Sequence, residues 1–229
     1  MLLSFLQATT EVVTVTQSQE IPPMSLFDMT VKGGPLMIPL FLLSIVAVYI
    51  FAERYWTIRK ASKIDVNFMN NIKDFIHDGK IKSAIGMCQH NNDKSIVRLI
   101  EKGLSRLGRP LSDIREAVEN TGNTEIARLE RGLPILASIS GGAPMIGFLG
   151  TVVGMVEAFY NMASAGNNID ITLLSSGLYV AMVTTVGGLI VGIMAYFGYN
   201  YLTARIEQLV YKMNTYAIEF MDILNEPAE

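Results

Sequence analysis

The feature that most constrains this chain is the placement of its charged residues, which are absent from three long runs. Residues 33–52, 132–156 and 171–204 contain no Asp, Glu, Lys or Arg. A helix needs about 20 mostly apolar residues to cross the hydrocarbon core of a bilayer. Each run meets that length, so we expect three transmembrane helices. The third run is longer than one crossing requires, so the end of its helix is expected to project beyond the membrane.

The overall composition agrees with a membrane protein and excludes several other classes. The 229 residues are 50% hydrophobic and 17% charged, whereas soluble domains carry about 25% charged residues. The net charge of −3 argues against nucleic acid as the main partner, because phosphate-binding proteins carry a basic surplus. A single cysteine, Cys88, excludes an intrachain disulfide framework, and with His77 and His90 it makes no metal-binding set. No phosphate-binding loop or nucleophile elbow occurs, so we predict a protein that is not an enzyme and needs no cofactor.

The basic residues predict how the chain is oriented in the membrane. Of the 18 Lys and Arg residues, 15 lie between Glu53 and Arg131, and residues 1–31 and 161–170 contain none. Loops on the cytoplasmic side of membrane proteins are enriched in Lys and Arg. We therefore expect the 53–131 segment and the C-terminal tail in the cytoplasm, with the N-terminus and the 161–170 loop on the outer, periplasmic side.

These patterns predict an all-α integral membrane protein with long cytoplasmic helical extensions. Its predicted segments are a periplasmic N-terminal extension (1–23), an outer interfacial segment with the first span (24–56), a cytoplasmic helical domain (57–131), the second span (132–160), a periplasmic loop (161–170), the third span (171–200) and a cytoplasmic C-terminal helix (201–229). Apolar periodicity predicts helices over residues 67–78, 81–90, 94–107 and 112–131, and the last is expected to run directly into the second span. The N-terminal stretch alternatively resembles a weak signal peptide, although it lacks a basic region.

The second and third spans differ from the first in the size of their side chains. The first span is rich in Leu, Ile and Phe, as expected of a helix that faces lipid. In the second span Gly147, Thr151, Gly154 and Ala158 recur at helical spacing, and Gly150 forms a GxxxG pair with Gly154. The third span repeats this rhythm with Gly177, Ala181, Thr184, Gly188, Gly192 and Ala195. Small faces let helices pack closely in lipid, so we interpret the glycines as packing residues.

The threonines of these two spans carry a second hypothesis. Thr151 and Thr185 each lie 17 residues from Asn168, near the tip of the outer loop, so an antiparallel hairpin places them at similar depth. In a symmetric oligomer such hydroxyls, with the adjacent Thr184, would form rings that pass ions or hold a carboxylate of a partner helix. A membrane threonine can instead bond only to its own helix. The residues alone leave both alternatives open.

Two further residues of the second span are candidates for special roles. Glu157 is the only acid within a membrane-spanning stretch, and an intramembrane acid is by default a functional candidate. It lies near the outer end of the span, where it could equally reach lipid headgroups or the loop. Pro144, in the inner half, is expected to kink the helix.

Three stretches of the sequence are distinctive: Lys32 to Pro39 at the first span, Ala143 to Phe159 with the Gly150-Thr151-Val152 block, and Gly177 to Asn200. In these stretches the chain resembles the MotA/TolQ/ExbB proton-channel family, and its ExbB branch most closely. The resemblance covers roughly residues 24–225. It departs from well-known ExbB members at Val180, where those carry a glutamate.

The resemblance implies a bacterial inner-membrane homopentamer whose second and third spans line a pore. The pore would hold the single helix of an ExbD-like partner with a membrane aspartate, and Thr151 and Thr185 match the pore-facing threonines of the family. Proton flow would then drive a molecular motor that energises a TonB-like protein for iron uptake across the outer membrane. A TolQ-like or gliding or secretion motor with another client, and a passive membrane scaffold, are the alternatives. H⁺ is the expected ion, with sodium as the alternative.

Overall fold

The computed structural model describes residues 33–164 and 171–225, and within these ranges the chain is helical without a strand. The predicted N-terminal extension, the interfacial segment up to residue 32 and the loop residues 165–170 lie outside the described residues. The helices are α3 (Met37–Ala61), α4 (Phe68–His77), α5 (Ile81–His90), α6 (Ser95–Leu104), α7 (Leu111–Glu130), α8 (Leu133–Ser164) and α9 (Ile171–Asn225). The predicted all-α class is confirmed.

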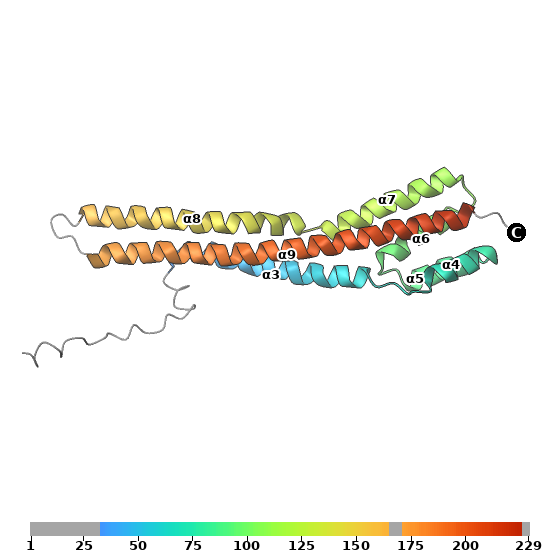
Figure 1. Ribbon diagram of the computed structural model, residues 1–229, viewed down its shortest axis with the longest axis horizontal. Helices are drawn as coiled ribbons and strands as arrows, with labels where there is room; N and C mark the ends of the chain where they lie inside the picture. Colours follow the sequence, from blue (N-terminus) through green and yellow to red (C-terminus); the bar gives the residue numbers. More distant parts are fainter. Residues whose placement is uncertain (1–32, 165–170, 226–229) are drawn as a thin grey trace, which may run out of the picture.

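Among the described residues, three stretches are long and apolar enough to cross a membrane, and they lie in α3, α8 and α9. In Figure 1, α8 and α9 lie side by side as an antiparallel hairpin, and α3 runs along the middle of α9. Most large apolar side chains on these helices are exposed in the single chain, for example Phe41, Phe148 and Phe197. Such surfaces are stable only in contact with lipid or with other protein chains.

The remaining helices, α4 to α7, gather around the C-terminal half of α9 (Figure 1). Their amphipathic sequences occupy the stretches where apolar periodicity predicts helices. They bury one apolar face each, and the C-terminal half of α9 supplies the other side of this core. The fully buried residues there include Ile72, Ile100, Leu104, Leu209, Met213 and Phe220. We call α4 to α7 with this part of α9 the helical domain.

The junction between α7 and α8 corrects one prediction, because the helix over 112–131 does not run directly into the second span. Arg131 is extended, with ψ 127°, and Gly132 has φ +87°. Positive φ is a conformation that glycine adopts without steric cost. Pro134 follows in the first turn of α8, where its missing N–H is tolerated; inside a continuous helix it would leave a carbonyl unpaired. The second span therefore begins with a new helix.

Candidate ion site in the α8–α9 hairpin

The backbones of α8 and α9 approach so closely that only glycine fits at several positions. A Cβ atom added to Gly188 would lie 2.6 Å from the carbonyl oxygen of Ala143, and one added to Gly147 would lie 3.0 Å from that of Thr184. On Gly154 a Cβ atom would lie 2.8 Å from the Cβ atom of Ala181. Such contacts leave no room for a side chain without a shift of the backbone. The hairpin is thus held by close contact between small residues, as is typical of helix pairs in lipid.

Two further predicted packing glycines face larger groups on the opposite helix. Gly150 lies against the side chain of Thr184, and Gly192 lies against the ring of Pro144. Pro144 is inside the continuous helix α8, and the kink predicted for it stays a prediction. Each glycine therefore has a partner on the opposite helix, and these contacts fix how far α8 is shifted along α9.

This fixed register brings Thr151 of α8 and Thr185 of α9 together. Their Oγ1 atoms are 3.4 Å apart, and both side chains are half-buried at one edge of the hairpin. The Thr185 hydroxyl donates to the carbonyl oxygen of Gly147 across the hairpin at 3.0 Å. The Thr151 hydroxyl donates to the carbonyl oxygen of Phe148 in its own helix at 2.6 Å. We call these two residues the threonine pair.

The hydrogen bonds of the threonine pair decide what it can bind. A hydroxyl has one hydrogen to donate and two lone pairs that accept. The Thr151 hydrogen goes to the Phe148 carbonyl. The single Thr185 hydrogen goes either to the Gly147 carbonyl or to Thr151 Oγ1. In either case lone pairs remain on the threonine oxygens for a ligand. Such a pair suits a protonated carboxyl, a hydrated proton or a metal cation. A bare carboxylate would be bound only after a hydroxyl rotated away from its carbonyl.

Thr184 and Glu157, the other two candidate ion-site residues, lie away from the threonine pair. Thr184 is 1% exposed, and its hydroxyl donates to the Ala181 carbonyl oxygen at 2.8 Å. In the single chain Thr184 therefore lies between α8 and α9 and not at the edge of the hairpin with the threonine pair. Glu157 is exposed on α8. It is six positions from Thr151, and at about 100° per residue their side chains point about 120° apart around the helix. The chain therefore does not bring Glu157 to the threonine pair.

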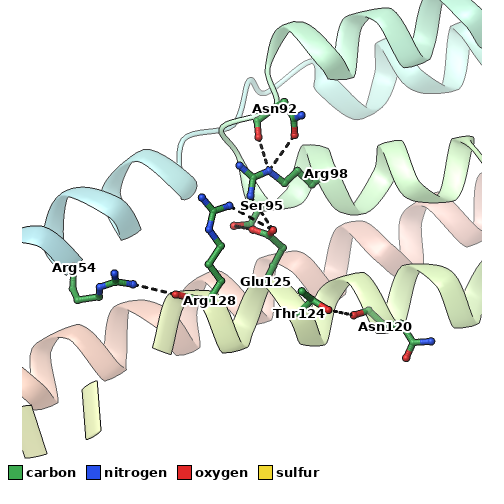
Figure 2. Close-up of polar contacts among 8 residues, drawn as sticks. All are labelled: Arg54, Asn92, Ser95, Arg98, Asn120, Thr124, Glu125 and Arg128. Carbon is green, nitrogen blue, oxygen red and sulfur yellow. Dashed lines mark hydrogen bonds and ion pairs between the residues drawn. The ribbon is translucent and has the colours of Figure 1, made fainter. Parts of the chain in front are cut away.

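The helical domain contains a buried ionic cluster that the sequence analysis did not predict (Figure 2). Glu125 of α7 is 7% exposed. Its Oε2 atom accepts a hydrogen bond from Ser95 Oγ at 3.0 Å, and its Oε1 atom accepts one from Arg98 Nη1 at 2.9 Å. A signal for it exists, because Glu125 falls on the same helix face as the buried Val118 and Leu129. An acid on an apolar face needs a buried partner.

The same region ties the helical domain to the end of α3. Arg54 Nη1 donates to the backbone carbonyl oxygen of Arg128 at 3.0 Å, as Figure 2 shows. Lys60 Nζ lies 2.9 Å from Asp93 Oδ2 in the connection between α5 and α6. The hydrogen bond and positive charge of Lys60 lower the pKa of the exposed Asp93 carboxyl. These contacts join the end of α3 to α7 and to the connection between α5 and α6.

His77, Cys88 and His90 are not part of either cluster. His77 and His90 are in the last turns of α4 and α5, and no group of three potential metal-ligating His, Cys, Asp or Glu side chains occurs within residues 33–164 and 171–225. Cys88 is fully buried in the helical domain. Burial, with a smaller effect of the Glu101 charge, raises the pKa of its thiol to about 12.

Comparison with known proteins identifies the family. The profile of the MotA/TolQ/ExbB proton channel family matches residues 91–215, which include the threonine pair and Glu125. The chain is 31% identical over 181 residues to the putative biopolymer transport protein ExbB-like 1 of Synechocystis sp., covering 78% of this chain and 71% of that protein.

Two other relatives show the breadth of the similarity. A putative biopolymer transport protein ExbB homolog of Methanothermobacter thermautotrophicus is 28% identical over 210 residues, or 87% of this chain and 72% of the relative. The Tol-Pal system protein TolQ of Pseudomonas aeruginosa is 30% identical over 115 residues, or 50% of this chain and 49% of the relative. The chain therefore belongs to the MotA/TolQ/ExbB proton channel family, close to ExbB.

Proposed function

We propose that this chain is the channel-forming subunit of a proton-driven motor in a bacterial inner membrane. The observation that carries the proposal is the threonine pair, two hydroxyl oxygens 3.4 Å apart within a membrane-spanning hairpin whose register is fixed by glycine contacts. Polar groups at this depth are costly in lipid unless they face protein or water. Membership of a proton channel family supports proton flow over a passive scaffold.

The proposed partner is an ExbD-like protein with a single membrane helix and an aspartate at the depth of the threonine pair. Because both threonine oxygens act as acceptors, they bind the protonated aspartate and release it when the proton leaves. Alternation between these two states moves the partner helix relative to the ring of channel subunits. Sodium would satisfy the same oxygens as a cation, and a flux measurement with each ion distinguishes them.

The proposed assembly is a homopentamer with the helical domain in the cytoplasm and the N-terminus in the periplasm. Two observations support it: the exposed apolar faces of α3, α8 and α9, and the enrichment of Lys and Arg between α3 and α8. Native mass spectrometry that gives a copy number other than five would contradict the pentamer.

The proposed client is a TonB-like protein that energises outer-membrane transport such as iron uptake. Similarity to relatives named ExbB supports this choice. The similarity to TolQ proteins supports a second candidate, a Tol-Pal-type motor with the same ion site and a different client. Growth on an iron source that requires TonB separates the two clients.

The ion site is tested by Thr151→Val and Thr185→Val, which keep the side-chain shape and remove the hydroxyl. We expect each to lower proton flux of the reconstituted complex with its partner by about two- to tenfold, since one hydrogen bond to a neutral group such as a protonated carboxyl contributes about 0.5–1.5 kcal/mol. Thr185→Ser should restore most of the flux. Membrane levels and assembly should stay unchanged.

The matched control is Thr203→Val, the same substitution as Thr185→Val and also on α9. Within the described residues its buried Oγ1 atom has no hydrogen-bond partner, so loss of the hydroxyl should leave flux unchanged. Wild-type flux in both Thr151→Val and Thr185→Val would contradict the assignment of the threonine pair as an ion site. A wild-type complex without ion flux would favour the scaffold.

A further inference from the structure

A basic pocket lies between the end of α3 and α9, on the side of the helical domain. It has a volume of about 480 Å³ and is lined by Tyr55, Ile58, Arg59, Ser62, Lys63, Tyr201, Leu202, Arg205, Gln208 and Lys212. Four of these side chains are cations, and none is an acid. Within residues 33–164 and 171–225, none of the four cations forms an ion pair. Four like charges around one cavity repel one another until an anion enters.

Each arginine of this pocket donates to a tyrosine one turn closer to the membrane-spanning part, and Arg205 Nη1 also donates to Gln208 Oε1 at 3.4 Å. Arg205 Nε and Nη2 both donate to the Tyr201 hydroxyl at 3.2 Å, one turn closer to the span. The Arg205 guanidinium also lies 5.2 Å from the centre of the Tyr201 ring. Arg59 Nη1 donates to the Tyr55 hydroxyl at 3.4 Å in the same way on α3. Two of the four positive charges, those of Arg59 and Arg205, are therefore held close to where the apolar stretches end.

An apolar groove begins at the same tyrosine and runs into the membrane-spanning part. It has a volume of about 550 Å³ and is lined by Ser44, Ala47, Val48, Phe51, Leu136, Val191, Ile193, Met194, Ala195, Phe197, Gly198 and Tyr201. Tyr201 lines both cavities, and its ring packs 6.4 Å from Phe51 and 6.3 Å from Tyr55, measured between ring centres. From Val191 to Tyr201 the helix rises about 15 Å. This equals half of the ~30 Å hydrocarbon core, or one leaflet.

We propose that the groove and the pocket together bind one anionic phospholipid. An acyl chain lies in the apolar groove, and the phosphate group lies among Arg59, Lys63, Arg205 and Lys212. The charge selects an anionic headgroup such as phosphatidylglycerol over a zwitterionic one, and the groove selects a lipid over free phosphate. The bound lipid joins α3 to α9 and fixes the depth of the helical domain below the membrane. The site is separate from the threonine pair and does not depend on ion flow.

Charge selectivity is tested on the full-length protein, reconstituted with phosphatidylglycerol or phosphatidylcholine and analysed by native mass spectrometry. The wild type should retain phosphatidylglycerol preferentially. A Lys63→Gln and Lys212→Gln double variant should bind it about 25-fold more weakly, at about fivefold per basic residue, and bind phosphatidylcholine as before. Lys82→Gln with Lys102→Gln removes two exposed lysines outside the pocket and should change nothing. Equal retention of both lipids by the wild type, or an equal loss in the control, would overturn the proposal.

Groove occupancy is tested by Val48→Trp, which fills the groove without changing charge. It should weaken binding of phosphatidylglycerol about tenfold or more, whereas Val46→Trp, on the same helix but outside the groove, should not. Inorganic phosphate serves as the headgroup alone. Should it compete fully with phosphatidylglycerol while Val48→Trp has no effect, the ligand would be free phosphate and the proposal wrong. A photoreactive residue at position 48 should label lipid, and a cross-link to a second copy of the chain would overturn the lipid assignment.

Discussion

The two halves of α9 pack against their neighbours in different ways. In the hairpin with α8 the contacts are made by small residues, and backbone meets backbone at Gly147 and Gly188. In the helical domain the contacts are made by large side chains, and the ring of Phe220 fills the space beside Gly103. Water drives apolar side chains together, whereas lipid provides no such drive between helices. One helix therefore changes its packing along its length because its solvent changes.

The polar groups of the hairpin and of the helical domain also differ, in a way that matches the lipid around one and the water around the other. The hairpin uses neutral hydroxyls that donate to backbone carbonyls, whereas the helical domain buries the carboxyl group of Glu125 beside Arg98. An ion pair in the hydrocarbon core would carry a high desolvation cost. In the helical domain part of the Arg98 side chain remains exposed to water, which reduces that cost. We expect the ionic cluster to control stability and the threonine pair to control ion binding.

The largest effect is expected when the ionic cluster of the helical domain is broken. Glu125→Leu leaves Arg98 without its ion-pair partner, although the Nε atom of Arg98 keeps its hydrogen bonds to Asn92. We expect the free energy of unfolding to fall by about 3 kcal/mol, the low end for a buried ion pair, because Arg98 is partly exposed and keeps these bonds. Denaturant titration of the protein in detergent micelles measures this change. The exposed Glu119 on the same helix provides the control, Glu119→Leu, which should cost far less. Similar losses in both variants would contradict the cluster's role.

A smaller effect is expected when the close contact of the hairpin is disturbed. Gly188→Ala places a Cβ atom 2.6 Å from the Ala143 carbonyl oxygen, so the backbones must separate. We expect a loss of about 2 kcal/mol, typical of overpacking, in the same denaturant titration. Gly141→Ala on α8 adds a Cβ atom into open space and should stabilise by about 0.5–1 kcal/mol through helix propensity. If both variants behave alike, backbone contact does not hold the hairpin.

The effect that is smallest near neutral pH sharpens the comparison by testing whether water reaches the core of the helical domain. Burial raises the pKa of the Cys88 thiol from 9.0 to about 12, so the folded state favours the neutral thiol. Its contribution to stability is present below pH 9.0 and is lost as the pH rises from 9.0 to about 12. Cys88→Ala should lack this part of the pH dependence when the unfolding free energies of both proteins are compared. Identical pH profiles would show that the thiol is not protected from water.

Part of the candidate site follows from sequence alone. Equal spacing of Thr151 and Thr185 from the turn predicts similar depth, because both arms of a helical hairpin rise at the same rate. The spacing gives no rotation of one helix about the other, so it cannot separate Thr185 at the edge of the hairpin from the buried Thr184. The break at Gly132 was also missed, although Gly132 followed by Pro134 is compatible with the start of a new helix.

Sequence by itself determined that the chain has three membrane-spanning helices, an all-α fold and a small-residue face on two of the spans, because charge and helical periodicity are local properties of the chain. Only the tertiary structure decided which hydroxyls meet, that Glu125 pairs with Arg98, and that four cations surround one cavity beside an apolar groove. Those results depend on the rotation and axial shift of helices packed against each other. The rotation and the axial shift are both set by contacts between residues far apart in the chain.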